Sequence, residues 1–124
     1  RKPSGDRVTT EPKYLRQVIQ KETAQTLTAM LIRVAEEGYD RKASVPGYYI
    51  AGKTGTAQIA EGGKYGTITI HTFVGFGPPN DAKFSVILKL HNVKNVAFAA
   101  DSTTPIFNEI ARFLLQYYKI PPNR

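Results

Sequence analysis

The residues with the clearest chemical potential lie between Gly47 and Thr56, where two motifs overlap. Gly47 to Thr54 spell G-x-x-x-x-G-K-T, the pattern of a loop that binds nucleotide phosphates. Lys53 to Thr56 spell K-T-G-T, which on a strand would place a positive charge, two hydroxyl groups and a glycine beside a cleft. Because Lys53 belongs to both motifs, its surroundings must decide which chemistry it serves.

The surroundings disfavour a phosphate-binding loop. Such a loop needs a buried strand before it and a helix that begins at its Lys-Thr pair, since the helix N-terminus binds the phosphates. Residues 40–46, DRKASVP, have no apolar strand pattern, and Gly55 follows Thr54 directly. Residues 48–50, YYI, are bulky strand formers at positions where backbone would have to wrap around phosphate. The sequence therefore disfavours a nucleotide hydrolase.

On a strand, the same residues suit recognition of an anionic acyl compound. Lys53 offers a fixed positive charge, and the hydroxyl groups of Thr54 and Thr56 can donate to a carboxylate. Gly55 carries no side chain that would block a cleft, and a backbone N–H near Thr56 can donate to a developing oxyanion. Taken alone, the four-residue string is equally compatible with a glycine-bearing strand that carries a surface lysine.

The elements that would position the motif follow from the spacing of apolar and turn residues. Apolar residues recur at helical spacing from Ala24 to Ala35, and Gly38 is placed to end that helix. Thr104-Pro105 favours the start of a second helix, because proline suits the first turn. The expected elements are a connector at 1–19, a helix at 20–37, strands at 48–60, 67–77 and 82–91, and a helix at 104–118.

This order predicts an α+β fold. The connections between the predicted strands are short, which favours a three-stranded antiparallel meander. The N-terminal and C-terminal helices would flank that sheet and bury its apolar side. We expect residues 20–124 to form one subdomain, with 1–19 as the connector that leads into it.

The composition limits the classes of function. The chain has 124 residues, of which 41% are hydrophobic and 22% charged, so it is typical of one globular unit. It has no cysteine, which excludes disulfides and thiolate metal sites, and no apolar run near the roughly 20 residues of a membrane helix. The net charge of +7 comes from scattered lysines and arginines, which indicates a solvated basic surface rather than a nucleic-acid site.

Four segments together carry a family resemblance. In chain order they read LRQVIQKETAQTLTAML, YYIAGKTGTAQ, HTFVGFGPPNDAKFSVILKL and PIFNEIARFLLQYYKIPP. Their order and spacing resemble the C-terminal part of the transpeptidase domain of class B penicillin-binding proteins, from about Glu11 to Pro122. The resemblance implies a fragment of the larger penicillin-binding, transpeptidase-like fold, in which K-T-G is one of three active-site motifs.

The resemblance also implies roles for the motif residues. The family's enzymes cross-link peptidoglycan through a serine that forms an acyl-enzyme with a stem peptide, and β-lactams acylate the same serine. Lys53 and Thr56 would be the catalytic residues here, with the Thr56 N–H in the oxyanion hole. Thr54, Gly55 and Thr56 would bind the substrate. No cofactor or metal is implied, and the parent protein would be anchored in the cell membrane with its active site on the extracytoplasmic or periplasmic side.

The family's nucleophile is missing from this sequence. None of the four serines, at positions 4, 44, 85 and 102, begins an S-x-x-K or S-x-N motif. We therefore expect the isolated chain to be inactive and to need the remaining part of the transpeptidase domain as a partner. The strand at 82–91 would be an open edge that favours pairing with that part or with a second copy.

Three other expectations complete the sequence analysis. A non-catalytic basic module that binds acidic partners or peptidoglycan is the alternative function, and a relative of β-lactamases is disfavoured by the segments around K-T-G. His71 and His91 lie on separate predicted strands, which favours a structural or surface role for each over a catalytic or metal-binding one.

Overall fold

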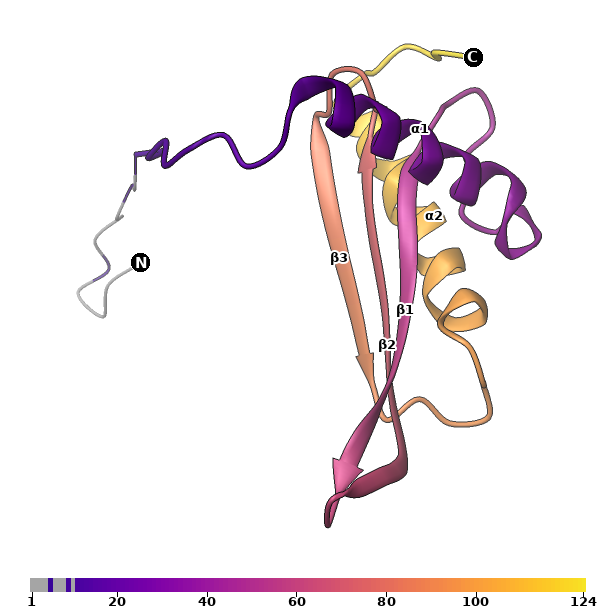
Figure 1. Cartoon of the computed structure of the whole chain (residues 1–124). Helices are drawn as coiled ribbons and strands as arrows, with labels where there is room; N and C mark the ends of the chain where they lie inside the picture. Colours follow the sequence, from indigo (N-terminus) through magenta and orange to yellow (C-terminus); the bar gives the residue numbers. More distant parts are fainter. Residues whose placement is uncertain (1–4, 6–8, 10) are drawn as a thin grey trace.

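The computed structural model describes residues 5, 9 and 11–124. Its α+β fold confirms the predicted class, with two helices and an antiparallel sheet of order β1-β2-β3 (Figure 1). The elements are α1 (Lys21–Glu37), the short 3-10 turn η1 (Tyr39–Arg41), β1 (Ala51–Glu61), β2 (Lys64–Gly77), β3 (Phe84–His91) and α2 (Ala99–Tyr117). Residues 11–20 carry no helix or strand, and most of the predicted connector before them lies outside the described residues.

The core lies where α2 packs on the sheet. Phe73 of β2 and Phe107 of α2 are both fully buried, and their ring centroids are 4.5 Å apart. Gly75 makes this approach possible, because a Cβ at that position would lie 2.4 Å from the Phe107 ring. Ala111 and Leu115 continue the buried face of α2 at four-residue spacing.

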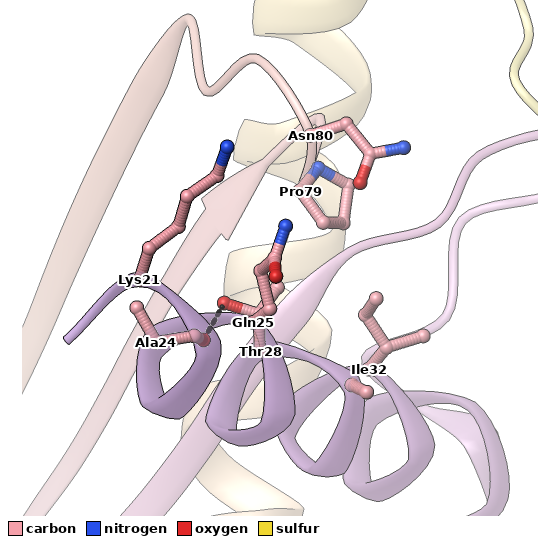
Figure 2. A pocket seen from close by; sticks show the side chains of 8 residues that line it. Lys21, Ala24, Gln25, Thr28, Ile32, Pro79 and Asn80 are labelled. Atoms are coloured by element: carbon pink, nitrogen blue, oxygen red, sulfur yellow. Dashed lines mark hydrogen bonds between the residues drawn. The ribbon is translucent and has the colours of Figure 1, made fainter.

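The first helix is less covered than its sequence suggests. α1 contacts β1 and is fully buried at Ala35, near its C-terminal end. Leu27 and Met30 belong to the predicted apolar stripe, yet they are 49% and 59% exposed. In the close view of Figure 2, α1 lies in front of the strands and α2 behind them. The described residues therefore leave part of the outer face of α1 without an apolar neighbour.

The second helix begins earlier than predicted. α2 starts at Ala99 rather than at Thr104, so that Pro105 lies inside the helix and not at its first turn. The N–H of Ala99 donates to Oγ1 of Thr56 at 3.2 Å. The first N–H groups of a helix have no acceptor within the helix, and here a residue of a distant strand accepts one of them. The sequence therefore shows no local capping residue at the helix start.

The first strand also differs from its predicted bounds. β1 begins at Ala51 rather than at 48, because Val45 to Tyr48 form a turn in which the Tyr48 N–H donates to the Val45 carbonyl at 3.0 Å. Gly47 has φ of +82° in this turn, a conformation that favours glycine. Gly47, the first glycine of the apparent phosphate-binding motif, is thus a turn residue.

The remaining boundary differences are small. β2 begins at Lys64 rather than at 67, because the hairpin turn needs only Gly62–Gly63, both with positive φ. β3 begins at Phe84 rather than at 82, and α1 begins at Lys21 rather than at 20.

The segment after α2 returns to the turn that precedes β1. Tyr48 donates its hydroxyl hydrogen to the Ile120 carbonyl at 2.8 Å, and the Tyr49 N–H donates to Oδ1 of Asn123 at 2.8 Å. The Asn123 N–H donates to the Gly47 carbonyl at 3.0 Å. Residues 120–123 therefore hold the chain in place immediately before the K-T-G-T strand.

The two histidines differ in environment. His71 of β2 is fully buried, and its Nδ1 lies 2.8 Å from Oγ of Ser102 on α2. His91 is exposed at the end of β3. His71 thus contributes a polar contact between sheet and helix beside the Phe73–Phe107 pair.

We predict that Gly75→Ala destabilises the fold by about 1–3 kcal/mol, because the added methyl group overlaps the Phe107 ring. Urea unfolding of the purified chain measures the change. Ser85→Ala, an exposed position on β3, is the control and should change stability by less than about 0.5 kcal/mol. Equal stability of Gly75→Ala and the wild type would contradict the close approach.

Candidate active-site wall

The four motif residues lie consecutively in β1. Lys53, Thr54, Gly55 and Thr56 pair with residues 74, 73, 72 and 71 of β2, respectively. β1 is at one edge of the sheet, and among the described residues no strand pairs with its other side. The motif is therefore on an accessible edge strand, as the strand interpretation requires, and no helix begins at Lys53-Thr54.

Lys53 presents an ammonium group to solvent. Its Nζ lies 3.3 Å from the Thr54 carbonyl oxygen and 5.7 Å from the centroid of the Tyr39 ring. Within the part of the chain that the structure describes, no carboxylate forms an ion pair with it. An exposed, unneutralised ammonium group is suited to attract an anionic ligand.

Close packing against the neighbouring strand explains why residue 55 is a glycine, which the sequence alone did not reveal. A Cβ at this position would lie 2.6 Å from Oγ1 of Thr72 on the neighbouring strand. The Thr72 hydroxyl donates to the Gly55 carbonyl at 3.2 Å, so the two residues are held together across the β1–β2 pair. A side chain at Gly55 would disturb that pair, whatever it did to a ligand.

Thr56 connects the motif to the start of α2. Its Oγ1 accepts the N–H of Ala99 at 3.2 Å, which uses an oxygen lone pair. The hydroxyl hydrogen can still be donated to a ligand, because accepting and donating use different parts of the group. Thr56 is also exposed, so a ligand can reach it.

Tyr39 is the site residue that sequence reasoning missed. Its Oη lies 3.0 Å from Oγ1 of Thr54, within hydrogen-bond distance, and accepts the Thr54 N–H at 3.5 Å. Tyr39, Asp40 and Arg41 have φ of 57°, 51° and 61°, a left-handed run that brings the chain back toward β1. Three consecutive non-glycine residues in this conformation have no signature in the sequence, so spacing alone could not have placed Tyr39 beside Thr54.

The pKa of Tyr39 lies below its ordinary value. Burial of the phenol by itself raises the pKa. The hydrogen bonds from Thr54 and the positive charge of Lys53 lower the pKa and outweigh the effect of burial. The phenol is therefore electrostatically coupled to two residues of the motif.

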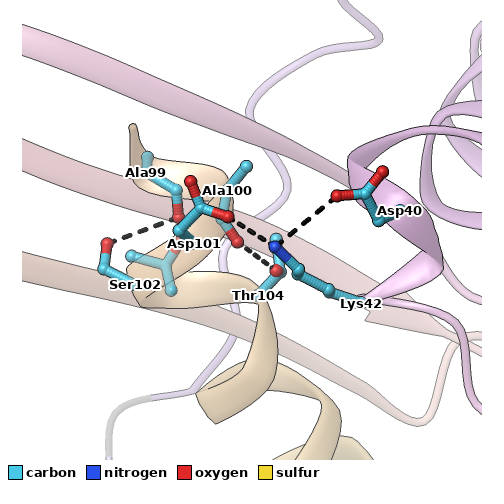
Figure 3. A network of polar contacts seen from close by, with 8 residues as sticks. Asp40, Lys42, Ala99, Ala100, Asp101, Ser102 and Thr104 are labelled. Atoms are coloured by element: carbon cyan, nitrogen blue, oxygen red, sulfur yellow. Dashed lines mark hydrogen bonds and ion pairs between the residues drawn. The ribbon is translucent and has the colours of Figure 1, made fainter. Parts of the chain in front are cut away.

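An ion-pair network anchors the turn that carries Tyr39. Lys42 contacts Asp40 in the same turn and Asp101 at the start of α2 (Figure 3). The hydrogen bond to Asp101 and the charges of both carboxylates raise the pKa of Lys42. This network connects the end of η1 to α2, so the turn is held from two sides.

One hollow on the surface lies away from the motif. It measures about 370 Å³ and is formed by α1 and the turn after β2, with Lys21, Gln25 and Thr28 on one side and Pro79 and Asn80 on the other (Figure 2). None of the four motif residues lines it. The candidate site is instead the accessible edge of β1, which carries the four motif residues.

Comparison with known proteins gives consistent matches. The family model of the penicillin binding protein transpeptidase domain matches residues 5–112. Stage V sporulation protein D of Bacillus subtilis is 36% identical over 111 residues, which cover 88% of this chain and 17% of that protein. Peptidoglycan D,D-transpeptidase FtsI of Buchnera aphidicola is 34% identical over 113 residues, which cover 89% of this chain and 20% of that protein.

Solved structures agree with the sequence matches. The apo transpeptidase domain of Burkholderia pseudomallei penicillin-binding protein 3 matches with a TM-score of 0.73 at 29% identity, covering 83% of this chain and 32% of that one. A peptidoglycan synthetase from Bifidobacterium adolescentis matches with a TM-score of 0.74 at 25% identity, covering 94% and 21%. The chain thus spans about a fifth or less of the length of the curated relatives described above.

We predict that Thr56→Val loosens the start of α2, because it leaves the Ala99 N–H without its acceptor while preserving side-chain volume. The expected loss is about 1 kcal/mol in urea unfolding, with faster amide hydrogen exchange in the first turn of α2. Thr67→Val, at an exposed position of β2, is the control and should change neither quantity. Unchanged exchange in Thr56→Val would mean that the bond does not hold the helix start.

Proposed function

Because this chain belongs to the family of penicillin-binding protein transpeptidase domains, we propose that it forms the K-T-G wall of a serine-type D,D-transpeptidase active site within a longer protein. The observation that carries the proposal is the position of Lys53 to Thr56 on an accessible edge strand, with the Lys53 ammonium group exposed and without a carboxylate partner among the described residues. The reaction would cross-link peptidoglycan stem peptides, and β-lactams would compete for the same site.

Each motif residue has a proposed role in that reaction. Lys53 attracts the ligand's carboxylate, and the hydroxyl groups of Thr54 and Thr56 donate to it. The Thr56 N–H stabilises the oxyanion that forms when a serine attacks the penultimate D-alanine carbonyl. The serine becomes acylated as the terminal D-alanine leaves, and the amine of a neighbouring stem peptide then takes the acyl group and releases the serine. Gly55 keeps the strand close to Thr72 and leaves space for the ligand.

The nucleophile must come from outside this chain. Ser44 contacts Glu36, Ser102 contacts His71, and Ser85 lies on β3, the strand farthest from β1 in the sheet. Ser4 lies outside the described residues. None of these serines starts an S-x-x-K or S-x-N motif, so we propose that the remaining part of the transpeptidase domain supplies both.

Exposed apolar side chains support the proposal that a large further part of the domain covers this chain. Leu27 and Met30 on α1, Val74 on β2 and Ile87 on β3 are each more than two-fifths exposed. Ile87, in the middle of the edge strand β3, is 72% exposed. Such surface is unusual for a self-contained domain and is suited to burial against the rest of a larger one.

The longer protein would act outside the cytoplasm. We propose that it is anchored in the cell membrane and carries this wall on the extracytoplasmic or periplasmic side, where peptidoglycan stem peptides are found. Among the described residues, neither helix has the length and apolar character needed to cross a bilayer.

A basic binding module is the second candidate function. The net charge of +7 and the isoelectric point near 9.7 favour association with acidic partners, including anionic wall polymers. This alternative needs neither the serine nor the K-T-G geometry, so binding that is unaffected by Lys53→Ala would favour it.

We predict that a fluorescent penicillin does not label the isolated chain, because the chain lacks the attacking serine. The protein that joins this chain to an S-x-x-K segment should be labelled stoichiometrically, and Lys53→Ala should slow that labelling by roughly 100-fold or more. Lys64→Ala, in the hairpin at the far end of β1 and β2, is the charge-matched control and should retain most of the rate. Stoichiometric covalent labelling of the isolated chain would overturn the proposed division of the active site.

We further propose that the outer edge of β3 pairs with another strand, either from the rest of the domain or from a second copy. Among the described residues β3 pairs only with β2, which leaves backbone groups on its other side without a strand partner. The isolated chain should therefore dimerise with rising concentration in sedimentation velocity, and Ile87→Lys should weaken the dimer. Thr67→Lys is the control. A strict monomer at every concentration would contradict self-association.

A further inference from the structure

Tyr39 reaches two consecutive residues of the K-T-G-T motif from the turn after α1. Its Oη lies 3.0 Å from Oγ1 of Thr54 and 3.5 Å from the Thr54 nitrogen. Its ring lies under the Lys53 ammonium group, with Nζ 5.7 Å from the centroid, a distance at which a cation is attracted to the ring face. One phenol thus contacts the hydroxyl, the backbone and the charge that the proposed function assigns to ligand binding.

The turn that holds Tyr39 is conformationally unusual. Tyr39, Asp40 and Arg41 all have positive φ, which residues with side chains rarely adopt. The turn is closed by the Arg41 N–H, which donates to the Gly38 carbonyl, and is tied to α2 through Lys42 and Asp101 (Figure 3). Backbone strain of this kind collects at functional sites, and here it brings a phenol to the motif.

We propose that Tyr39 is a positioning residue that sets the direction in which the Thr54 hydroxyl donates, and through it the binding of the ligand's carboxylate; this rests on the proposed function above. A hydrogen bond between two hydroxyl groups can run in either direction. When the neutral phenol donates to Oγ1 of Thr54, the Thr54 hydrogen points to the carboxylate. A tyrosinate has no hydrogen, so the Thr54 hydroxyl must then donate to Tyr39.

The sign of the pH dependence follows from this choice of direction. The bonds from Thr54 and the charge of Lys53 outweigh burial and lower the pKa of Tyr39, so tyrosinate forms here at a lower pH than in a free tyrosine. Ionisation removes one donor from the ligand's carboxylate and places a negative charge near it. Ligand binding therefore weakens as the pH rises through the pKa of Tyr39.

A Tyr39→Phe variant separates Tyr39 from the other charged groups near it. Asp40 and Asp101 are both paired with Lys42. Arg41 lies in the same short turn as Tyr39. These groups and Lys53 are present in the wild type and in a Tyr39→Phe variant alike, so any alkaline change that both proteins share does not belong to Tyr39.

The experiment uses the protein that joins this chain to its S-x-x-K segment. Rapid-mixing measurements with a fluorescent penicillin separate the binding constant from the acylation rate constant, from neutral pH to about pH 10.5. Wild-type binding should weaken about tenfold across the titration of Tyr39, with little change in the acylation rate constant. Tyr39→Phe should lack this step, whereas Tyr117→Phe, exposed on α2, should retain it. A Tyr39→Phe profile identical to the wild type would overturn the proposal.

Two further variants keep the outcomes separable. Thr54→Val removes the hydroxyl that hydrogen-bonds to Tyr39 and keeps the phenol, so NMR titration should show a higher Tyr39 pKa than in the wild type. An unchanged Tyr39 pKa would overturn the proposed contact. This measurement does not depend on whether Tyr39→Phe folds. Unchanged labelling in Lys53→Ala would refute the proposed function itself. Loss of labelling in Lys53→Ala, together with the wild-type alkaline step in Tyr39→Phe, would refute only the role of Tyr39.

Discussion

The close packing of α2 on β2 is the constraint on which the rest of the structure depends. Phe107 lies against Phe73 and over Gly75, so the helix sits closer to the sheet than a side chain at Gly75 would allow. At that depth the first N–H of α2 reaches Thr56, and Ser102 reaches the buried His71. The helix start and the motif strand are thus fixed relative to each other by apolar packing, with polar contacts setting the register.

The motif strand is supported from several directions because it has no neighbour on its outer side among the described residues. β2 holds it through the sheet and through Thr72, α2 holds Thr56, and the turn after α1 brings Tyr39 to Thr54. These supports leave the Lys53 ammonium group exposed. The binding role that we propose for this strand needs this combination of fixed backbone and accessible charge, since a donor that is already oriented loses little freedom when a ligand arrives.

Much of this architecture could be predicted from the sequence, because period-two and helical patterns report which side of an element is buried. The α+β class, the antiparallel meander and the strand setting of Lys53 followed from such patterns. The start of α2 did not, because its cap is Thr56 in a distant strand, and the proline rule placed the start at Thr104 instead. Tyr39 was missed for a related reason: its contact with Thr54 depends on a left-handed turn that no local residue preference indicates. Sequence reasoning thus failed where tertiary contacts determine local structure.

The return of residues 120–123 to the turn before β1 has a consequence for the order of events during synthesis. Gly47 and Tyr49 can complete their hydrogen bonds only after Asn123 has been translated and has left the ribosome. At typical rates of elongation, the intervening chain takes roughly 4–15 s to make. Throughout that interval the start of the motif strand lacks its final support, so a nascent chain must keep an unfinished strand edge from pairing with the wrong neighbour.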